Sequence, residues 1–215
     1  MTQVEIYTGS KLPRPHFANE ISEVRDRLCE AAMRRFAMHG AEGLTMRMLA
    51  ADVGCSPMKP YRYFSDKDEL ISAMRAMAFD RFAQALEDAA GGADNARSQA
   101  VAIGDAYVAF ALANREAYRL MFDNGPSNGR AHPDLSRARA RADRVVTSCV
   151  EALIADDVLA GDPNLIGRMF WAAIHGIVML EFTGLLTHGG DVDILRREIT
   201  RALFIGLSGG TESGG

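Results

Sequence analysis

Apolar side chains recur every three or four residues along most of this chain, and this spacing constrains its fold more than any other feature. Residues three and four apart lie on one face of an α-helix, whereas a half-buried strand needs apolar and polar residues to alternate. The first clear stripe ends before Gly40 and contains Ile21, Val24, Leu28, Ala32 and Phe36. No stretch alternates for long enough to indicate a strand. The sequence therefore predicts an all-α fold of about nine helices.

Polar residues that can accept hydrogen bonds from free backbone N–H groups mark where these helices should begin. The expected N-terminal caps are Thr45, Ser56, Ser65, Asp94, Asn114, Asp162 and Asp191. Ser56 and Asp162 are each followed by a proline, which suits the first helical position because an N–H there has no helical partner. Asp68 follows Ser65 by three residues, as in a capping box.

Composition places the chain among ordinary globular proteins. It has 215 residues, 48% of them apolar and 24% charged, so a core can form without disulfides. The cysteines, three in number and far apart, offer neither a disulfide framework nor a metal-binding pair. The first residues lack the apolar run of a secretory signal, and we expect a cytoplasmic protein. The formal net charge of −4 does not point to nucleic acid, so any basic surface must be local.

Four segments are expected along the chain. Residues 1–18 show no helical periodicity and predict a flexible arm. Residues 19–72 predict a small helical domain, residues 73–208 a larger one, and residues 209–215 a flexible, glycine-rich tail.

Residues 43–70 carry the clearest functional signal. They predict two short helices joined by a turn that contains Gly54, with the long preceding helix packed across them. Three helices joined in this way form a helix-turn-helix, whose second short helix enters the DNA major groove. The expected inward residues are Leu44, Met48, Leu49, Val53 and Phe64. Residues 24–67 contain eight Lys and Arg against five Asp and Glu, a local balance of +3 that suits phosphate contacts.

This region resembles the DNA-binding domain of the TetR/AcrR family of bacterial transcriptional regulators. The resemblance is carried in order and spacing by three groups of residues. These are Ala31, Ala32, Phe36 and Gly40; then Thr45, Leu49, Ala50, Gly54 and Ser56; then Tyr61, Tyr63, Phe64, Lys67 and Leu70. The resemblance implies a homodimer that binds a near-palindromic operator and is released by a small molecule.

The same resemblance implies roles for individual residues in DNA binding. Contacts to phosphate are expected from Thr45, Tyr61, Tyr63 and Lys67, and contacts to base edges from Arg47, Met58, Lys59 and Arg62. For Tyr63 the alternative is a half-buried packing residue, and for Arg62 a solvated surface residue.

Pro60 departs from the family pattern, which has an aliphatic residue at this position. A proline here removes the first hydrogen bond of a helix that begins at Pro57, and it disfavours helical dihedrals at Lys59. The recognition helix could therefore begin at Pro60, which would change which side chains reach the bases.

The run from Met169 to Leu186 is 18 mostly apolar residues, just long enough to raise the question of a membrane span. Glu181, His175 and the helix start at Asp162 argue against a span, and no membrane partner is expected. A helix that is apolar all round is more simply buried on two sides, one of them against a partner subunit. The expected dimer interface includes Ile177, Leu195, Ile199 and Leu203.

Trp171, His175 and Gly176 resemble the signature of the WHG type of C-terminal domain found in this family. An apolar effector pocket is expected from aromatic, methionine and histidine side chains, with core packing as the alternative for each. The expected pocket residues are Tyr107, Phe110, Tyr118, Met121, Phe122, Trp171, His175 and Met179. For His175 the alternative is a hydrogen-bonded, buried polar group.

No catalytic or metal-binding arrangement is recognisable. There is no Ser/His/Asp motif and no glycine-rich phosphate loop, and His132, His175 and His188 lack ligand spacing. We therefore expect no catalytic residue, no metal and no cofactor. The predicted function is a one-component transcriptional regulator, a repressor rather than an activator, whose partners are operator DNA, a second copy and a small effector. The alternatives are an all-α enzyme or small-molecule carrier, and a protein whose helix-turn-helix contacts other proteins.

Overall fold

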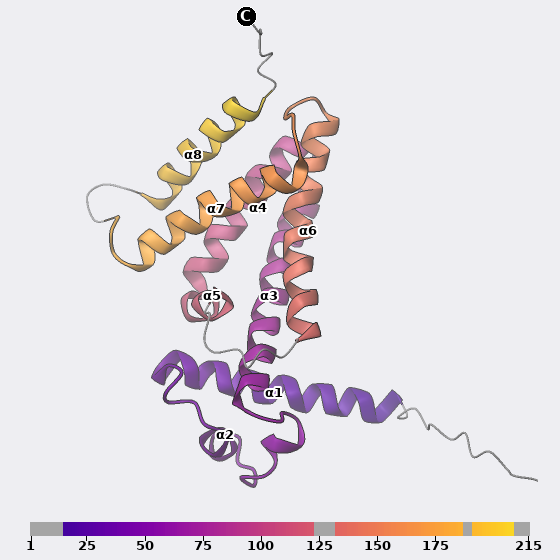
Figure 1. The fold of residues 1–215 in the computed structure, drawn as a ribbon, viewed down its shortest axis with the longest axis vertical. Helices are drawn as coiled ribbons and strands as arrows, with labels where there is room; N and C mark the ends of the chain where they lie inside the picture. The colour runs from indigo at the N-terminus through magenta and orange to yellow at the C-terminus, as the bar shows by residue number, and fades with distance from the viewer. Residues whose placement is uncertain (1–14, 123–131, 187–190, 209–215) are drawn as a thin grey trace, which may run out of the picture. The chain divides into compact units, whose positions relative to one another are not determined.

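The structure, a computed structural model, describes residues 15–122, 132–186 and 191–208 (Figure 1). These residues form eight α-helices and one 3-10 turn, and they contain no strand. The all-α prediction is confirmed, and the expected count of about nine helices is close to the observed one. Residues 1–14 of the predicted arm, His188, and the predicted tail at 209–215 lie outside the described residues.

The chain divides into two compact units, residues 1–70 and 71–215. The expected boundary between residues 72 and 73 lies near this division, and both fall within helix α3 (Lys67–Gly91).

The first unit contains α1 (Pro15–His39), α2 (Met46–Asp52), the 3-10 turn η1 (Pro60–Arg62) and the first residues of α3. Helix α1 begins inside the predicted arm, because residues 15–18 are helical. It ends just before Gly40, whose φ of +65° is unfavourable for residues with a side chain. The core of this unit is apolar and includes Leu28, Ala32, Leu44, Leu49, Phe64 and Leu70.

Helix α2 differs from the expected pattern in which methionine it buries. Met46 is buried, whereas Met48 is 44% exposed. Thr45 caps α2 as predicted, and the helix therefore begins at Met46 and buries residues 46, 49 and 50, which share one face. Val53 is half-buried at the C-terminal end of α2.

Two predicted caps are displaced by one residue. The Asp66 side chain, rather than that of Ser65, accepts the Glu69 N–H at 2.8 Å, and the Glu69 carboxylate accepts the Ser65 N–H at 2.7 Å. In α4 (Ala96–Ala113) the cap is Asn95 rather than Asp94, in a full capping box with Ser98. In both helix starts the cap side chain accepts the N–H of the residue three positions later, as a capping residue does.

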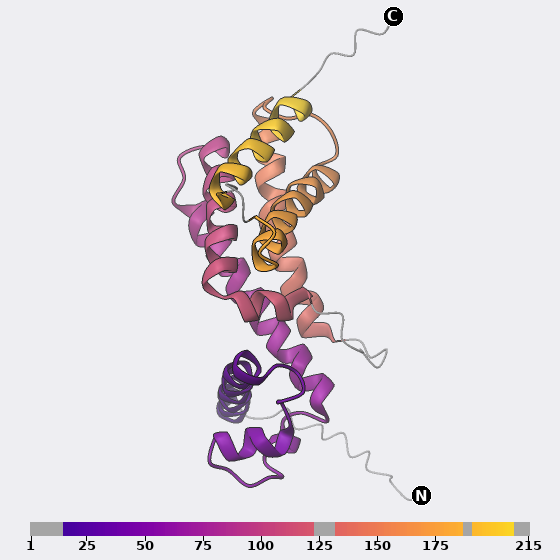
Figure 2. The ribbon, with the colours of Figure 1, turned by 90° about the vertical axis from the view of Figure 1, so that its left-hand side faces the viewer.

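The second unit contains the rest of α3, then α4, α5 (Arg115–Phe122), α6 (Pro133–Ala155), α7 (Pro163–Phe182) and α8 (Val192–Leu207). Helix α7 packs against both α6 and α8, and α4 packs against α6 and α7 (Figures 1 and 2). Asp162 and Asp191 cap α7 and α8 as predicted. Asn114 lies between α4 and α5, where it is the C-terminal cap of α4.

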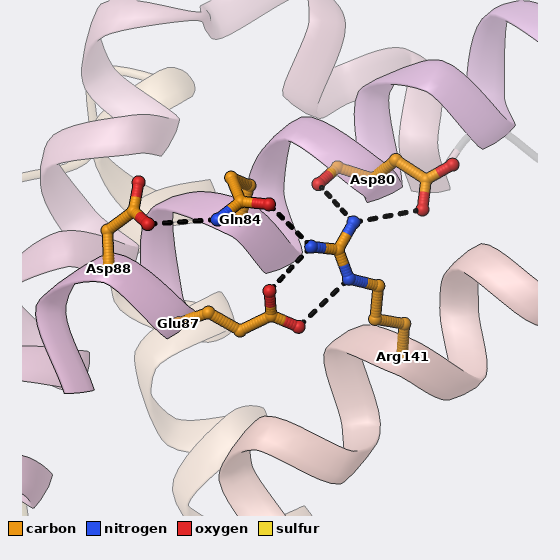
Figure 3. Close-up of polar contacts among 5 residues, drawn as sticks. All are labelled: Asp80, Gln84, Glu87, Asp88 and Arg141. Carbon is orange, nitrogen blue, oxygen red and sulfur yellow. Dashed lines mark hydrogen bonds and ion pairs between the residues drawn. The ribbon is translucent and has the colours of Figure 1, made fainter. Parts of the chain in front are cut away.

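Arg141 on α6 connects that helix to α3 through several charged and polar side chains (Figure 3). Its Nε and Nη2 atoms donate to the two carboxylate oxygens of Glu87, at 2.9 and 2.5 Å. Nη2 also donates to Gln84 at 2.6 Å, and Nη1 lies 3.4 Å from the Asp80 carboxylate. The hydrogen bonds from the Arg141 guanidinium hold the pKa of the Glu87 carboxyl below its ordinary value.

Arg141→Met should lower the free energy of unfolding by about 1 kcal/mol, because it removes a bidentate ion pair and keeps the aliphatic stem. Since the pKa of Glu87 is lowered in the fold, this contribution is present above the ordinary glutamate pKa and is lost as the pH falls below it. Urea denaturation at pH 7 and in acid measures both effects. Arg137→Met is the matched control, because the partner of Arg137 within the described residues is an exposed Asp134 on its own helix. An equal loss of unfolding free energy in the two variants would contradict a stabilising role for the Arg141 contacts between α6 and α3.

Candidate functional site

The turn after α2 reverses the chain at a glycine. Gly54 has a φ of +66°, and the Cys55 N–H donates to the Ala50 carbonyl at 2.9 Å. This bond satisfies a carbonyl at the end of α2 and requires the left-handed backbone that glycine adopts without strain. The turn therefore directs residues 56–63 away from α2, as the helix-turn-helix reading predicts.

Arg35 on α1 holds both ends of α2. Its Nη1 atom donates to the two carboxylate oxygens of Asp52, at 3.0 and 2.8 Å. Its Nε atom donates to the Gly43 carbonyl at 2.9 Å. Because Gly43 precedes α2 and Asp52 ends it, one guanidinium fixes the orientation of this helix on α1.

Arg25 on α1 holds the segment that follows η1. Its Nη1 atom donates to the Tyr63 carbonyl and lies 3.4 Å from the Glu69 carboxylate. Its guanidinium lies 4.5 Å from the centre of the Phe64 ring, in a cation–π contact. Two arginines of one helix thus connect it to α2 and to the segment around η1.

The expected helix beginning after Ser56 is not formed, and consecutive tight turns occupy residues 56–63. The Lys59 N–H donates to Ser56, the Arg62 N–H to Lys59 and the Tyr63 N–H to Pro60, at 2.9–3.1 Å. Each of these bonds joins residues three apart, as in a 3-10 helix. Pro60 has no N–H with which to reach the Ser56 carbonyl, so the first bond of an α-helix here is missing.

Lys59 nevertheless keeps helical dihedrals, with φ −63° and ψ −43°, although Pro60 was expected to disfavour them. The Pro60 ring is buried, and its carbonyl accepts the Phe64 N–H at 3.0 Å. Burial of the ring and this bond outweigh the local preference before proline. We call residues 56–63 the recognition segment.

Most of the predicted DNA-contacting side chains are exposed. The exposed ones are Thr45, Arg47, Met58, Lys59, Tyr61 and Arg62. Tyr63 and Lys67 are half-buried, and the Lys67 ammonium donates to the Ala41 carbonyl at 2.5 Å. An ammonium carries three N–H groups, so Lys67 keeps donors for a phosphate. The Thr45 oxygen accepts the Met48 N–H at 3.2 Å, which leaves its hydroxyl hydrogen available to donate.

In the second unit, most of the predicted pocket residues come together as a packed cluster of rings. Phe82 on α3 lies edge-on to Tyr107, Phe110, Trp171 and Tyr118, at centroid distances of 4.9, 5.3, 5.8 and 6.4 Å. Phe122 joins the cluster through the His175 ring, at 4.4 Å. Met121 is fully buried, and Met179 is half-buried on α7. These rings fill the space that the sequence assigns to a pocket.

Three polar groups inside this cluster form a continuous chain. The Tyr107 and Tyr118 hydroxyls are 2.7 Å apart, and the Tyr118 hydroxyl is 2.7 Å from Nδ1 of His175. If Tyr107 donates to Tyr118 and Tyr118 donates to Nδ1, every hydroxyl is satisfied and the ring proton stays on Nε2. Burial raises the pKa of both tyrosines and lowers the pKa of His175. His175 is therefore a neutral, hydrogen-bonded side chain at pH 7, as one of the two sequence interpretations states.

Because the pKa of His175 is lower in the fold than in the unfolded chain, the unfolded chain binds the extra proton first. We therefore expect the free energy of unfolding to fall as the pH is lowered from 7 through the ordinary histidine pKa of about 6.5. Urea denaturation between pH 7 and pH 5 measures this slope. His175→Gln should remove that part of the slope, whereas His39→Gln, at an exposed position on α1, should retain it. A slope unchanged in His175→Gln would show that another group is responsible.

A cavity lies beside this cluster, among α4, α6, α7 and α8. The space that water can occupy in it is about 50 Å³. Of the predicted pocket residues, only Tyr107 and Trp171 line it. Phe110, Tyr118, Met121, Phe122, His175 and Met179 do not, because the ring cluster takes up their side chains.

The sequence analysis missed the polar residues of this cavity, Arg196 and Thr200 on α8. Arg196 is only 5% exposed. One signal was available, since Arg196, Thr200 and Phe204 follow one another at helical spacing and therefore share a face. The prediction followed the neighbouring apolar residues Leu195, Ile199 and Leu203 and did not consider Arg196.

Three of the four predicted dimer residues remain partly exposed in the single chain. Ile177 is buried within the second unit, and Leu195, Ile199 and Leu203 are half-buried. The exposed large apolar side chains on α7 and α8 are Leu165, Leu180, Ile194 and Ile205.

Helix α7 is the one described helix long and apolar enough to cross a membrane. Length and composition alone are weak evidence, because a core helix passes the same test. The described residues hold no group of three or more His, Cys, Asp or Glu side chains that could bind a metal ion.

Comparison with known protein families finds a matching family profile for each of the two units. Residues 28–74 match the family profile described as bacterial regulatory proteins of the tetR family. Residues 100–203 match the profile described as a tetracyclin repressor-like C-terminal domain. Together the two profiles cover most of the described chain.

Three individual proteins illustrate the similarity. The HTH-type transcriptional regulator Rv1816 of Mycobacterium tuberculosis is 26% identical over 201 residues, covering 79% of this chain and 84% of that protein. The HTH-type transcriptional repressor AcnR of Corynebacterium diphtheriae is 38% identical over 69 residues, covering 32% and 36%. A solved structure from Rhodococcus sp. RHA1, of a protein with unknown function, is 31% identical with a TM-score of 0.78, covering 86% of this chain and 96% of that one.

The family and the named relatives point to a regulator rather than an enzyme. Together with the helix-turn-helix of the first unit, they show that this chain is a DNA-binding transcriptional regulator of the TetR family.

Proposed function

We propose that this regulator is a cytoplasmic homodimeric repressor that binds a near-palindromic operator and is released by a small, mainly apolar molecule. The observation that carries the operator-binding part is the recognition segment, a short element with six exposed residues that is held on α1 by Arg25. Repression is supported by the similarity to a protein named as a transcriptional repressor.

The recognition segment and α2 supply the proposed DNA contacts. Arg47, Met58, Lys59 and Arg62 are assigned to base edges, because they are exposed and because arginine and lysine donate to guanine in the major groove. Thr45, Tyr61, Tyr63 and Lys67 are assigned to phosphates. Each of these four has a hydroxyl or ammonium group that can donate to a phosphate oxygen.

Selection of bound sequences from a random duplex library should enrich an inverted repeat, with affinity falling steeply as salt rises. Lys67→Ala should weaken specific and non-specific binding alike, because a phosphate contact carries no sequence information. Arg62→Ala should relax the sequence preference at one position of each half-site, at a cost of about 1–3 kcal/mol. Arg97→Ala, on α4 of the second unit, is the control that should change neither. If no inverted repeat is enriched, the proposed near-palindromic operator is refuted.

The proposed dimer interface is the exposed face of α7 and α8. Ile194 and Ile205 on α8 are 52% and 64% exposed, and Leu165 and Leu180 are exposed on α7. A side chain added at Gly176 on α7 or at Gly206 on α8 would meet no described atom within 4 Å, so a partner helix could approach closely at both. An exposed apolar face of this kind is typical of a protein interface.

Ile205→Glu should convert a dimer into a monomer, because a charge in an apolar interface has no partner to offset its desolvation. Sedimentation velocity at micromolar concentration measures the change. The matched control is Val101→Glu, which places the same charge at a similarly exposed position on α4 and should remain dimeric. A monomeric parent protein, or two variants that behave alike, would refute the assignment of this face.

The proposed effector site is the cavity among α4, α6, α7 and α8 rather than the ring cluster. Apolar walls from four helices surround it, and all four belong to the second unit. A molecule that enters it must separate these helices, because the open space is small. Release of DNA follows if the separated arrangement binds operator less well than the closed one.

A further inference from the structure

Arg196 is the only residue of α8 that is fully buried, although it carries a charge. Its Nη2 atom is paired with the carboxylate of Asp105 on α4, and that carboxylate remains 56% exposed. Its Nη1 atom lies over Gly104, where an added Cβ would be 3.2 Å away. Glycine in the middle of a helix is unfavourable by about 1 kcal/mol relative to alanine, and here it gives the guanidinium its room.

The third nitrogen of this guanidinium has no such contact. Nε of Arg196 is buried and finds no hydrogen-bond partner among the residues that the structure describes. The Oγ1 atom of Thr200, one helical turn further along α8, is in the same condition within the described chain. A buried donor without an acceptor is costly, so two such donors on one face need an explanation.

Both donors belong to side chains that line the cavity. Its other walls are apolar apart from the Cys149 thiol, the indole of Trp171 and Tyr107, whose hydroxyl is already bonded to Tyr118. The site therefore offers an apolar space with two hydrogen-bond donors at one side, both from α8. A ligand matched to it has an apolar body and one acceptor oxygen.

The charge of the site decides which kind of oxygen fits. Arg196 already faces the carboxylate of Asp105, so the pair is neutral as a whole. A ligand carboxylate buried in the cavity would add an uncompensated charge in an apolar setting. A ligand carbonyl oxygen can accept both hydrogen bonds and adds no charge. The open space of about 50 Å³ excludes a bulky body, and a single ring or a short chain fits once the surrounding helices separate.

We propose that this cavity binds a small neutral carbonyl compound, such as an apolar ketone or ester, whose oxygen accepts from Nε of Arg196 and from the Thr200 hydroxyl. This assignment rests on the proposed function, because it names the chemical class of the effector that releases the operator.

Calorimetric titration of the full chain without DNA compares three molecules of one size. Acetophenone has the carbonyl oxygen, ethylbenzene has the same skeleton without it, and benzoate has a carboxylate. Acetophenone should bind about tenfold more tightly than ethylbenzene, the ratio expected for one net hydrogen bond to buried donors. Benzoate should bind more weakly than acetophenone at pH 7.

Thr200→Val keeps the shape of the side chain and removes its hydroxyl. It should reduce the preference for acetophenone over ethylbenzene to about threefold or less, with ethylbenzene binding retained. Thr200→Ser keeps a hydroxyl and should restore the preference. The matched control is Thr147→Val, which changes a half-buried threonine of α6 that does not line the cavity, and it should leave the preference intact.

Three results would overturn the proposal. These are no binding of acetophenone at millimolar concentration, equal affinity for acetophenone and ethylbenzene, and tighter binding of benzoate. Because these titrations contain no DNA, such a result leaves operator binding standing. Conversely, a failed search for an operator leaves a measured carbonyl preference standing.

Discussion

The edge-on packing of rings around Phe82 is the constraint on which the second unit depends. Phe82 comes from α3, and the rings against it come from α4, α5 and α7, so one side chain brings four helices together. Aromatic pairs in this geometry contribute about 0.5–1.5 kcal/mol each beyond the area that they bury. Tyr107 and Trp171 have a second role, because the same two side chains also line the cavity. The cluster therefore sets one boundary of the cavity among α4, α6, α7 and α8.

The polar atoms of this cluster explain a histidine in an otherwise apolar helix. A buried tyrosine hydroxyl needs a partner, and Tyr107 finds one in Tyr118. Tyr118 in turn needs one, and Nδ1 of His175 supplies it at 2.7 Å. The chain ends at the half-buried imidazole of His175. His175 is thus accounted for by packing and hydrogen bonding, with no ligand required.

The sequence alone predicted the parts of the fold that depend on neighbouring residues, such as where helices begin. Thr45, Asp162 and Asp191 cap helices as predicted, because a side-chain acceptor beside an apolar stripe has few other uses. The recognition segment was harder, since two prolines remove N–H groups and the outcome depends on the burial of Pro60 and on Arg25 from a distant part of α1. The cavity was harder to predict than the recognition segment. Trp171 and Tyr107 were both expected to line a pocket and both line the cavity, but only the packed structure distinguishes rings that fill a space from rings that border one.

Helix α8 carries the proposed effector donors and the proposed dimer contacts on different faces. Arg196 and Thr200 line the cavity, whereas Ile194 and Ile205 are exposed to the outside. Because a helix is stiff over its length, a ligand that displaces Arg196 also displaces Ile194 two residues away. The two proposals are therefore physically linked, since occupancy of the cavity would alter the surface through which two copies meet. A ligand has this effect only to the extent that it binds one arrangement of α8 more tightly than the other, and a coupling of 1–3 kcal/mol is typical of such systems. Nε of Arg196 and the Thr200 hydroxyl, which have no partner among the described residues, would supply such a difference by favouring the arrangement of α8 in which both reach the ligand oxygen.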